Sequence, residues 1–146
     1  MVDMAKAQTT ELFNCTVEEF YKIIADYEKY PEFLKEVKSC KVIKSEGAKK
    51  QVDYHLALIK EFKYILQMNE TPNAKIEWEF LSGDIFKSMK GSWKLDPEAG
   101  KCRATYTVEA SFGLLVPGPI ANGVISVNLP NMISSYHKRV NQLYGK

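Results

Sequence analysis

The sequence predicts an α+β protein in which a seven-stranded, curved antiparallel sheet wraps around a long C-terminal helix. Three features of the chain predict this fold: segments that alternate apolar and polar residues, short turns between them, and helical periodicity near both ends. Side chains alternate between the faces of a strand, so the apolar residues of these segments share one face and the charges share the other. An amphipathic helix must bury its apolar stripe, and this sheet face is the large surface that could cover it.

The strands follow from the alternating segments. Residues 5–14 predict an edge strand. Turn-forming residues separate most of the later segments, and connections this short permit antiparallel neighbours but not parallel crossovers. Six further strands are predicted at 37–45, 50–59, 62–70, 74–81, 88–96 and 101–112.

Two helical regions frame the sheet in sequence. Thr16 and Glu19 have the spacing of a capping box, which predicts a helix start, and Pro31 predicts its end. Short helical structure is therefore expected between the first and second strands. Apolar residues recur with a 3.6-residue period over 125–144, and Pro130 inside this pattern predicts either a kink or the true first turn.

Length and composition indicate one domain, residues 1–146, of ordinary globular type. The chain is 45% apolar and 26% charged with a net charge of +2, and its only arginines are Arg103 and Arg139, which makes nucleic acid a poor first candidate as partner. Nothing resembles a signal peptide or a membrane span, so a cytoplasmic location is expected. Cys15, Cys40 and Cys102 have no paired spacing, and we expect three buried thiols outside any disulfide.

The inward face of the predicted sheet carries no ionisable acid or base and no histidine, but many aromatic residues. Any one of them could simply be core. Buried tyrosine hydroxyls need hydrogen-bond partners, however, and several on one apolar face predict a lined pocket with a few polar groups. The expected ligand-binding residues are Tyr54, Leu56, Tyr64, Leu66, Trp78, Phe80, Met89, Trp93, Tyr106, Phe112, Leu129, Met132, Ile133 and Tyr136.

An apolar loop follows the last predicted strand. Loops are usually polar, so this one is either packed into the core or forms an apolar lip that admits a ligand and makes transient contact with a membrane surface. We expect a hinged gate made of Gly113, Leu114, Leu115, Val116 and Gly118.

No arrangement of catalytic or metal-binding residues is evident. The register places His55 on the outer face and leaves His137 on the last helix, where it could flank the cavity. The sequence contains no metal-ligand spacing and no Gly-rich phosphate loop, so neither a catalytic residue nor a metal or cofactor is predicted. Any catalysis would not depend on a histidine, and a binding protein is favoured over an enzyme.

Residues 15–20, 24–34, 56–63, 91–95 and 136–145 resemble the START-like (SRPBCC, helix-grip) superfamily, and nearly the whole chain is covered. The most specific element is Tyr30, Pro31, Phe33 and Leu34, which is similar to the polyketide cyclase/dehydrase and coenzyme Q-binding branch. That branch also contains the ribosome-association toxin family. The resemblance implies a cavity between the curved sheet and the C-terminal helix that holds a lipid, a quinone or another hydrophobic molecule.

Three functions are therefore open. Binding or transport of an extended hydrophobic molecule, such as a lipid or prenyl quinone, is favoured. An aromatase/cyclase-type enzyme acting on a polyketide-like substrate is the first alternative, and a polar cavity beneath Tyr54, Tyr64 and Tyr106 would favour it. A ribosome-binding regulator is the second, and a narrow, filled cavity beside a basic patch would favour it. The one lysine cluster, at 35–50, is interleaved with glutamates, so it is either a mixed solvated face or a weak dock for anionic lipid or RNA.

Overall fold

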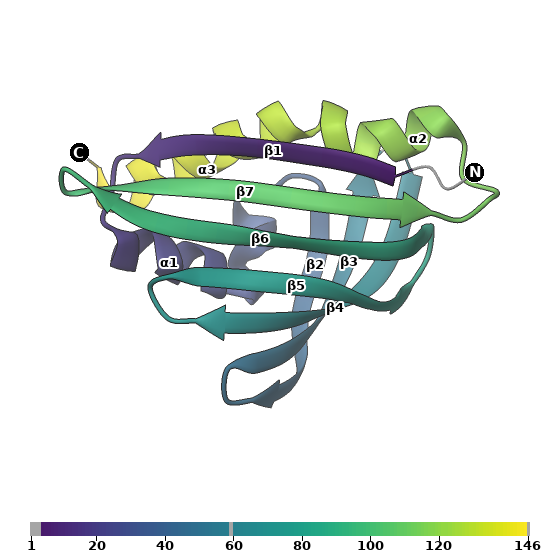
Figure 1. The fold of residues 1–146 in the computed structure, drawn as a ribbon, viewed down its shortest axis with the longest axis horizontal. Coiled ribbons are helices and arrows are strands. Elements are labelled where there is room, and N and C mark those ends of the chain that lie inside the picture. Colours follow the sequence, from purple (N-terminus) through teal and green to yellow (C-terminus); the bar gives the residue numbers. More distant parts are fainter. Residues whose placement is uncertain (1–3, 59, 146) are drawn as a thin grey trace.

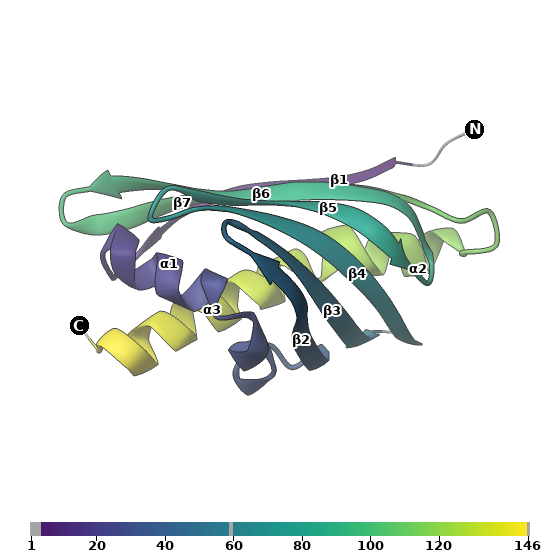
Figure 2. The same ribbon diagram turned by 90° about the horizontal axis from the view of Figure 1, so that it is seen from below.

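The computed structural model describes residues 4–58 and 60–145. Its strands form one antiparallel sheet in the order β1-β7-β6-β5-β4-β3-β2. Strands β2 to β7 follow one another in sequence order, and β1 pairs with the other edge of β7. The sheet curls around the C-terminal helix α3 (Figures 1 and 2). The strands are β1 (Met4–Phe13), β2 (Val37–Glu46), β3 (Lys49–Leu58), β4 (Lys60–Thr71), β5 (Lys75–Gly83), β6 (Phe86–Glu98) and β7 (Lys101–Phe112).

This architecture confirms the predicted fold class. Every predicted strand is present, with ends that differ from the prediction by at most two residues. Ile59, the predicted last residue of the strand 50–59, lies outside the described residues. The alternation also holds in three dimensions. In β4, for example, Phe62, Tyr64, Leu66 and Met68 are buried, whereas Lys63 on the opposite parity is exposed.

The helical region between β1 and β2 differs from the prediction at its end. The helix α1 (Val17–Ala25) begins at the predicted capping box, in which the Thr16 side chain accepts from the Glu19 amide at 3.1 Å and the Glu19 carboxylate accepts from the Thr16 amide at 2.9 Å. It ends at Ala25, before Pro31. A 3-10 helix, η1 (Tyr27–Glu32), follows and contains Pro31.

The C-terminal helical region has three parts. A short helix α2 (Gly118–Asn122) leads through a π-helical turn η2 (Gly123–Val127) into α3 (Leu129–Tyr144). Pro130 lies in the first turn of α3, where its missing amide proton costs no hydrogen bond, so the second of the two expectations for this proline is confirmed. No helix in the described ranges is long and apolar enough to cross a membrane.

Polar contacts fix α3 against β1, against η1 and, through the Tyr144 hydroxyl that donates to the Glu19 carbonyl at 3.3 Å, against α1. His137 Nε2 lies 3.1 Å from Glu11 Oε1 of β1, and the imidazole ring packs on Phe13 with ring centroids 4.3 Å apart. On another side of the helix, Arg139 pairs with Glu32 of η1 at 2.8 Å and covers the Phe33 ring. The helix is thereby held over the apolar face of the sheet, and the space between the two becomes the candidate site.

Candidate ligand-binding cavity

A cavity of about 140 Å³ lies between the inner face of the sheet, η1 and the C-terminal helical region. Its floor comes from β3 to β7, and its other walls come from Ile24 of α1, Tyr30 of η1, Ile125 of η2 and Tyr136 of α3. At about 30 Å³ per water molecule, this volume corresponds to roughly five waters. The space is therefore larger than a packing defect, but below the roughly 300–1,000 Å³ of a pocket for a drug-sized ligand.

The structure brings most of the residues expected to bind ligand to this cavity. Phe80 and Phe112 lie behind it instead, and their rings contact Phe86, which lines it. Ile133 is buried in the core and Leu129 is half-buried, and neither lines the cavity. The ten that line it are Tyr54, Leu56, Tyr64, Leu66, Trp78, Met89, Trp93, Tyr106, Met132 and Tyr136.

Strand periodicity could not find the lining residues that lie outside the strands. Tyr30 comes from the 3-10 helix, Glu36 precedes β2, and Asn128 joins η2 to α3. The alternation predicts an inner sheet face free of ionisable acids and bases, but this is wrong, because Lys50 of β3 and Glu70 of β4 share that face and pair at 2.5 Å. Neither of them lines the cavity. The cavity contains a carboxylate because the sheet is not its only wall. The Tyr-Pro-x-Phe-Leu element ends two residues before Glu36 and could have drawn attention to this segment.

Five tyrosines line the cavity, and their hydroxyl groups differ in how they are satisfied. Tyr30 donates to the Ile24 carbonyl oxygen at 2.5 Å, and the Tyr54 hydroxyl lies within hydrogen-bonding reach of the Cys40 thiol. Among the described residues, no hydrogen bond joins the hydroxyl of Tyr64 or of Tyr106 to a protein group. Neither hydroxyl is among the fully buried side-chain atoms without a partner, so both are accessible from the cavity that they line and are the groups best placed to bind a guest.

Burial determines the protonation state of these tyrosines. It raises the pKa of Tyr54, Tyr64, Tyr106 and Tyr136 well above the ordinary tyrosine value, and nearby ionisable groups add to the effect. All four therefore stay neutral at physiological pH. They can donate and accept hydrogen bonds, but they do not supply a tyrosinate base.

Two hydrogen bonds hold Glu36 in place, one at its backbone and one at its side chain. The backbone carbonyl of Glu36 accepts from the Ala57 amide of β3 at 2.8 Å, and the carboxylate Oε2 accepts from the Asn128 side-chain amide at 2.7 Å. Glu36 lines the same cavity as Tyr64, Tyr106 and Tyr136, and its charge contributes to their raised pKa values. The cavity is thus apolar with one polar region.

The predicted gate lies beside the cavity. The Gly113 amide donates to the Ile85 carbonyl at 2.8 Å, next to Phe86 of the cavity wall, and the loop continues into α2, with Gly118 as its first residue. Leu114 and Leu115 are each 97% exposed, so core packing does not account for this loop. Two exposed leucines and a half-buried Val116 leave an apolar loop in solvent.

Both histidines lie outside the cavity lining. His55 is on the outer face, as its parity predicts, and pairs with Glu61 at 3.2 Å, and His137 pairs with Glu11. Within the described ranges, no group of three or more His, Cys, Asp or Glu side chains could hold a metal ion.

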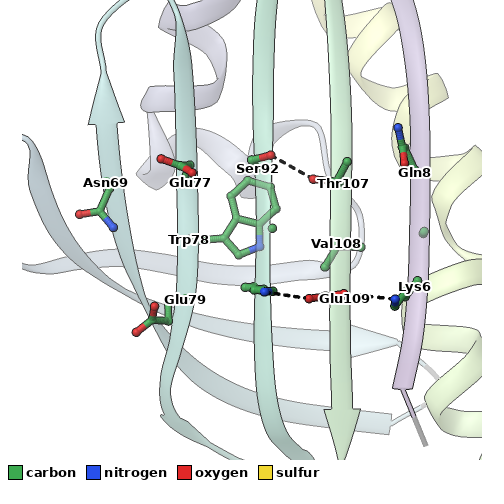
Figure 3. A pocket seen from close by; sticks show the side chains of 13 residues that line it. Lys6, Gln8, Asn69, Glu77, Trp78, Glu79, Ser92, Thr107, Val108 and Glu109 are labelled. Atoms are coloured by element: carbon green, nitrogen blue, oxygen red, sulfur yellow. Dashed lines mark hydrogen bonds and ion pairs between the residues drawn. The ribbon is translucent and has the colours of Figure 1, made fainter.

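A larger hollow, of about 760 Å³, lies on the outer face of the sheet, over β1 and β4 to β7 (Figure 3). It is an open, polar trough. The Ser92 and Thr107 hydroxyls form a hydrogen bond of 3.0 Å, and Glu109 pairs with Lys90 at 3.1 Å and Lys6 at 3.7 Å, as the dashed lines show. Because solvent and neighbouring side chains satisfy these groups, the smaller inner cavity is the better candidate for an apolar guest.

A curved sheet that grips a C-terminal helix around an internal cavity defines a START-like, helix-grip protein. The chain belongs to the family described as polyketide cyclase/dehydrase and lipid transport, whose model matches residues 14–135. This confirms the resemblance noted in the sequence.

Individual relatives are more distant. The chain is 24% identical over 149 residues to the ribosome association toxin RatA of Vibrio cholerae serotype O1, covering 98% of this chain and 100% of RatA. A START superfamily protein from Mycobacterium smegmatis superposes with a TM-score of 0.84 at 20% identity, covering 94% of this chain and 98% of that one. The Zhui aromatase/cyclase from Streptomyces sp. R1128 superposes with a TM-score of 0.71 at 14% identity, covering 95% of this chain and 87% of that one. At these identities the two structures show the shared fold alone.

Proposed function

We propose that this protein binds a mostly apolar molecule and holds one ring of it in the cavity between the sheet and α3. A prenyl quinone and a phenolic lipid each carry such a ring at one end of an apolar tail. The observation that carries the proposal is an internal apolar cavity into which Tyr64 and Tyr106 bring hydroxyls that have no protein partner among the described residues.

The volume of the cavity sets the size of the guest. An apolar protein cavity of about 150 Å³ can hold benzene, so about 140 Å³ suits a single six-membered ring. A complete lipid or an extended polyketide chain would not fit. The expectation of an extended ligand therefore holds only if its tail leaves the cavity, and the apolar loop 113–117 lies where a tail could pass and meet a membrane surface.

Calorimetric titration with 4-pentylphenol, a ring with a short tail, tests this proposal. The wild-type chain is expected to bind one molecule saturably. Met132→Trp places an indole into the cavity and should weaken binding at least tenfold, which is about 1.4 kcal/mol. Leu143→Trp makes the same kind of change at an exposed position of the same helix and should bind as the wild type does. Equal binding by both variants would place the phenol elsewhere and refute the proposal.

Ribosome association is a second candidate function, favoured by the similarity to RatA over the full length of both chains. In the lysine cluster of residues 35–50, Lys38 and Lys41 are exposed on β2, while Lys50 pairs with Glu70 at 2.5 Å. Sedimentation of the protein with ribosomes tests this function, and a Lys38→Glu/Lys41→Glu variant should then stay in the supernatant.

None of the three cysteines forms a disulfide, which supports a reducing, cytoplasmic location under either function.

A further inference from the structure

Glu36 sets a chemical requirement on the guest, because a carboxylate can only accept hydrogen bonds. Its Oε2 accepts from the Asn128 amide, and among the described residues no protein group donates to its Oε1. Glu36 lines the cavity together with Tyr64 and Tyr106. One acceptor oxygen therefore remains available beside two hydroxyls that have no protein partners.

We propose that the Glu36 carboxylate receives a hydrogen bond from a hydroxyl group of the ligand, so that the cavity selects a phenol or an enol over a ring without a donor. The inference rests on the proposed function and names the class of its ligand. A quinone carbonyl has no proton to donate and would face the carboxylate with a second acceptor. The reduced, hydroxyl-bearing form of such a ring has the matching chemistry.

The surroundings of Glu36 favour a defined geometry for this contact. The backbone of Glu36 is tied to β3 through Ala57, and Asn128 fixes the carboxylate plane from the opposite wall. A preorganised acceptor loses little freedom on binding, and a hydrogen bond to a charged group is stronger than one between neutral groups. Tyr64 and Tyr106, as neutral hydroxyls, can then complete the hydrogen bonds of the bound oxygen.

The test compares probes of one shape that differ in their donor. The phenol, 4-pentylphenol, is the one hydrogen-bond donor. Pentylbenzene and 4-pentylanisole are controls without a donor, one smaller and one larger than the phenol, and 4-pentylbenzaldehyde presents a carbonyl acceptor. The wild-type protein should bind the phenol at least tenfold more tightly than the other three. Pentylbenzene and the anisole bracket the phenol in size, so volume alone cannot produce this order.

Glu36→Gln separates recognition from a structural role. A glutamine can still accept from Asn128, but it presents an amide donor in place of the second carboxylate oxygen. The phenol should lose about tenfold or more in affinity, while the aldehyde gains. Glu46→Gln makes the same change at an exposed position of β2 and should leave all affinities unchanged.

The outcomes are distinguishable. If all four probes bind the wild type equally, the cavity accepts apolar rings without selection by Glu36, and the inference fails while the proposed function stands. An equal factor of change for every probe in Glu36→Gln would show that Glu36 only closes the cavity, which also overturns the inference. If no probe binds, the proposed function itself fails.

Discussion

Gly91 and Trp78 form a cross-strand pair that shapes the floor of the cavity. Without a side chain at 91, the Trp78 indole lies across β6 toward Tyr106 of β7, with ring centroids 5.6 Å apart. The sequence shows the glycine as a gap in an aromatic face, which marks either a close approach of another residue or free space for a ligand. The structure shows a close approach instead, because the neighbouring indole fills the gap.

Replacing Gly91 by alanine should therefore destabilise the fold. An added Cβ would lie 2.6 Å from Trp78 ring atoms and closer still to the Thr107 carbonyl oxygen, which belongs to the backbone and cannot move aside. We expect a loss of at least about 2 kcal/mol in the free energy of unfolding, measured by urea denaturation. At Gly118 an added Cβ meets nothing within 4 Å, and Gly118→Ala should change stability by less than about 0.5 kcal/mol. Similar values for the two variants would contradict this packing.

At the scale of elements, the strands and the start of α1 were predictable because alternation, turns and a capping box are local in sequence. The ends of the helices were less predictable. Tyr27 continues the apolar stripe of α1 but belongs to the 3-10 helix, and the apolar period through Ile125 crosses a π-helical turn before α3 begins. A periodic pattern marks which residues face the core, and it does not distinguish helices of slightly different pitch.

The loop between β7 and α2 allows a prediction about entry of the ligand. Leu114→Ser/Leu115→Ser should leave the melting temperature within about 2 °C of the wild type, since both side chains are 97% exposed. The same variant should take up a fluorescent phenolic lipid from vesicles more slowly and bind vesicles less. Ile43→Ser/Leu81→Ser removes two exposed apolar side chains on the sheet and serves as the control. A large drop in melting temperature with unchanged uptake would rule out a gate.

The contact between β1 and α3 should make stability depend on pH in the acid range. The hydrogen bond from His137 lowers the pKa of the Glu11 carboxyl from its ordinary value of 4.5. A carboxyl whose pKa is lower in the folded state stabilises the fold fully above the unfolded pKa, and this contribution is lost as the pH falls through the lowered value.

Glu11→Gln should accordingly lose less stability than the wild type between about pH 6 and about pH 3, as measured by urea denaturation at each pH. Glu46→Gln, at an exposed hairpin end, is the control and should follow the wild-type curve. Parallel curves for all three proteins would show that the pKa of Glu11 does not change on folding, which would contradict this account.

At the scale of the whole molecule, the position of the cavity was predictable and its size was not. Inward parity placed Tyr54, Tyr64 and Trp93 on a common face, but the volume depends on how deeply α3 and η2 settle against the sheet. The polar region was missed for a related reason. Glu36 and Asn128 come from irregular segments far apart in sequence, and only the closed fold brings them together.

Native mass spectrometry of the protein purified from its natural host tests the central claim most directly, when followed by extraction of any bound molecule. We expect the mass of one chain plus one molecule that carries a hydroxylated ring and an apolar tail. The Met132→Trp variant from the same host should carry none of it. A wild-type chain that carries no small molecule and sediments with ribosomes would contradict this account and favour the regulator.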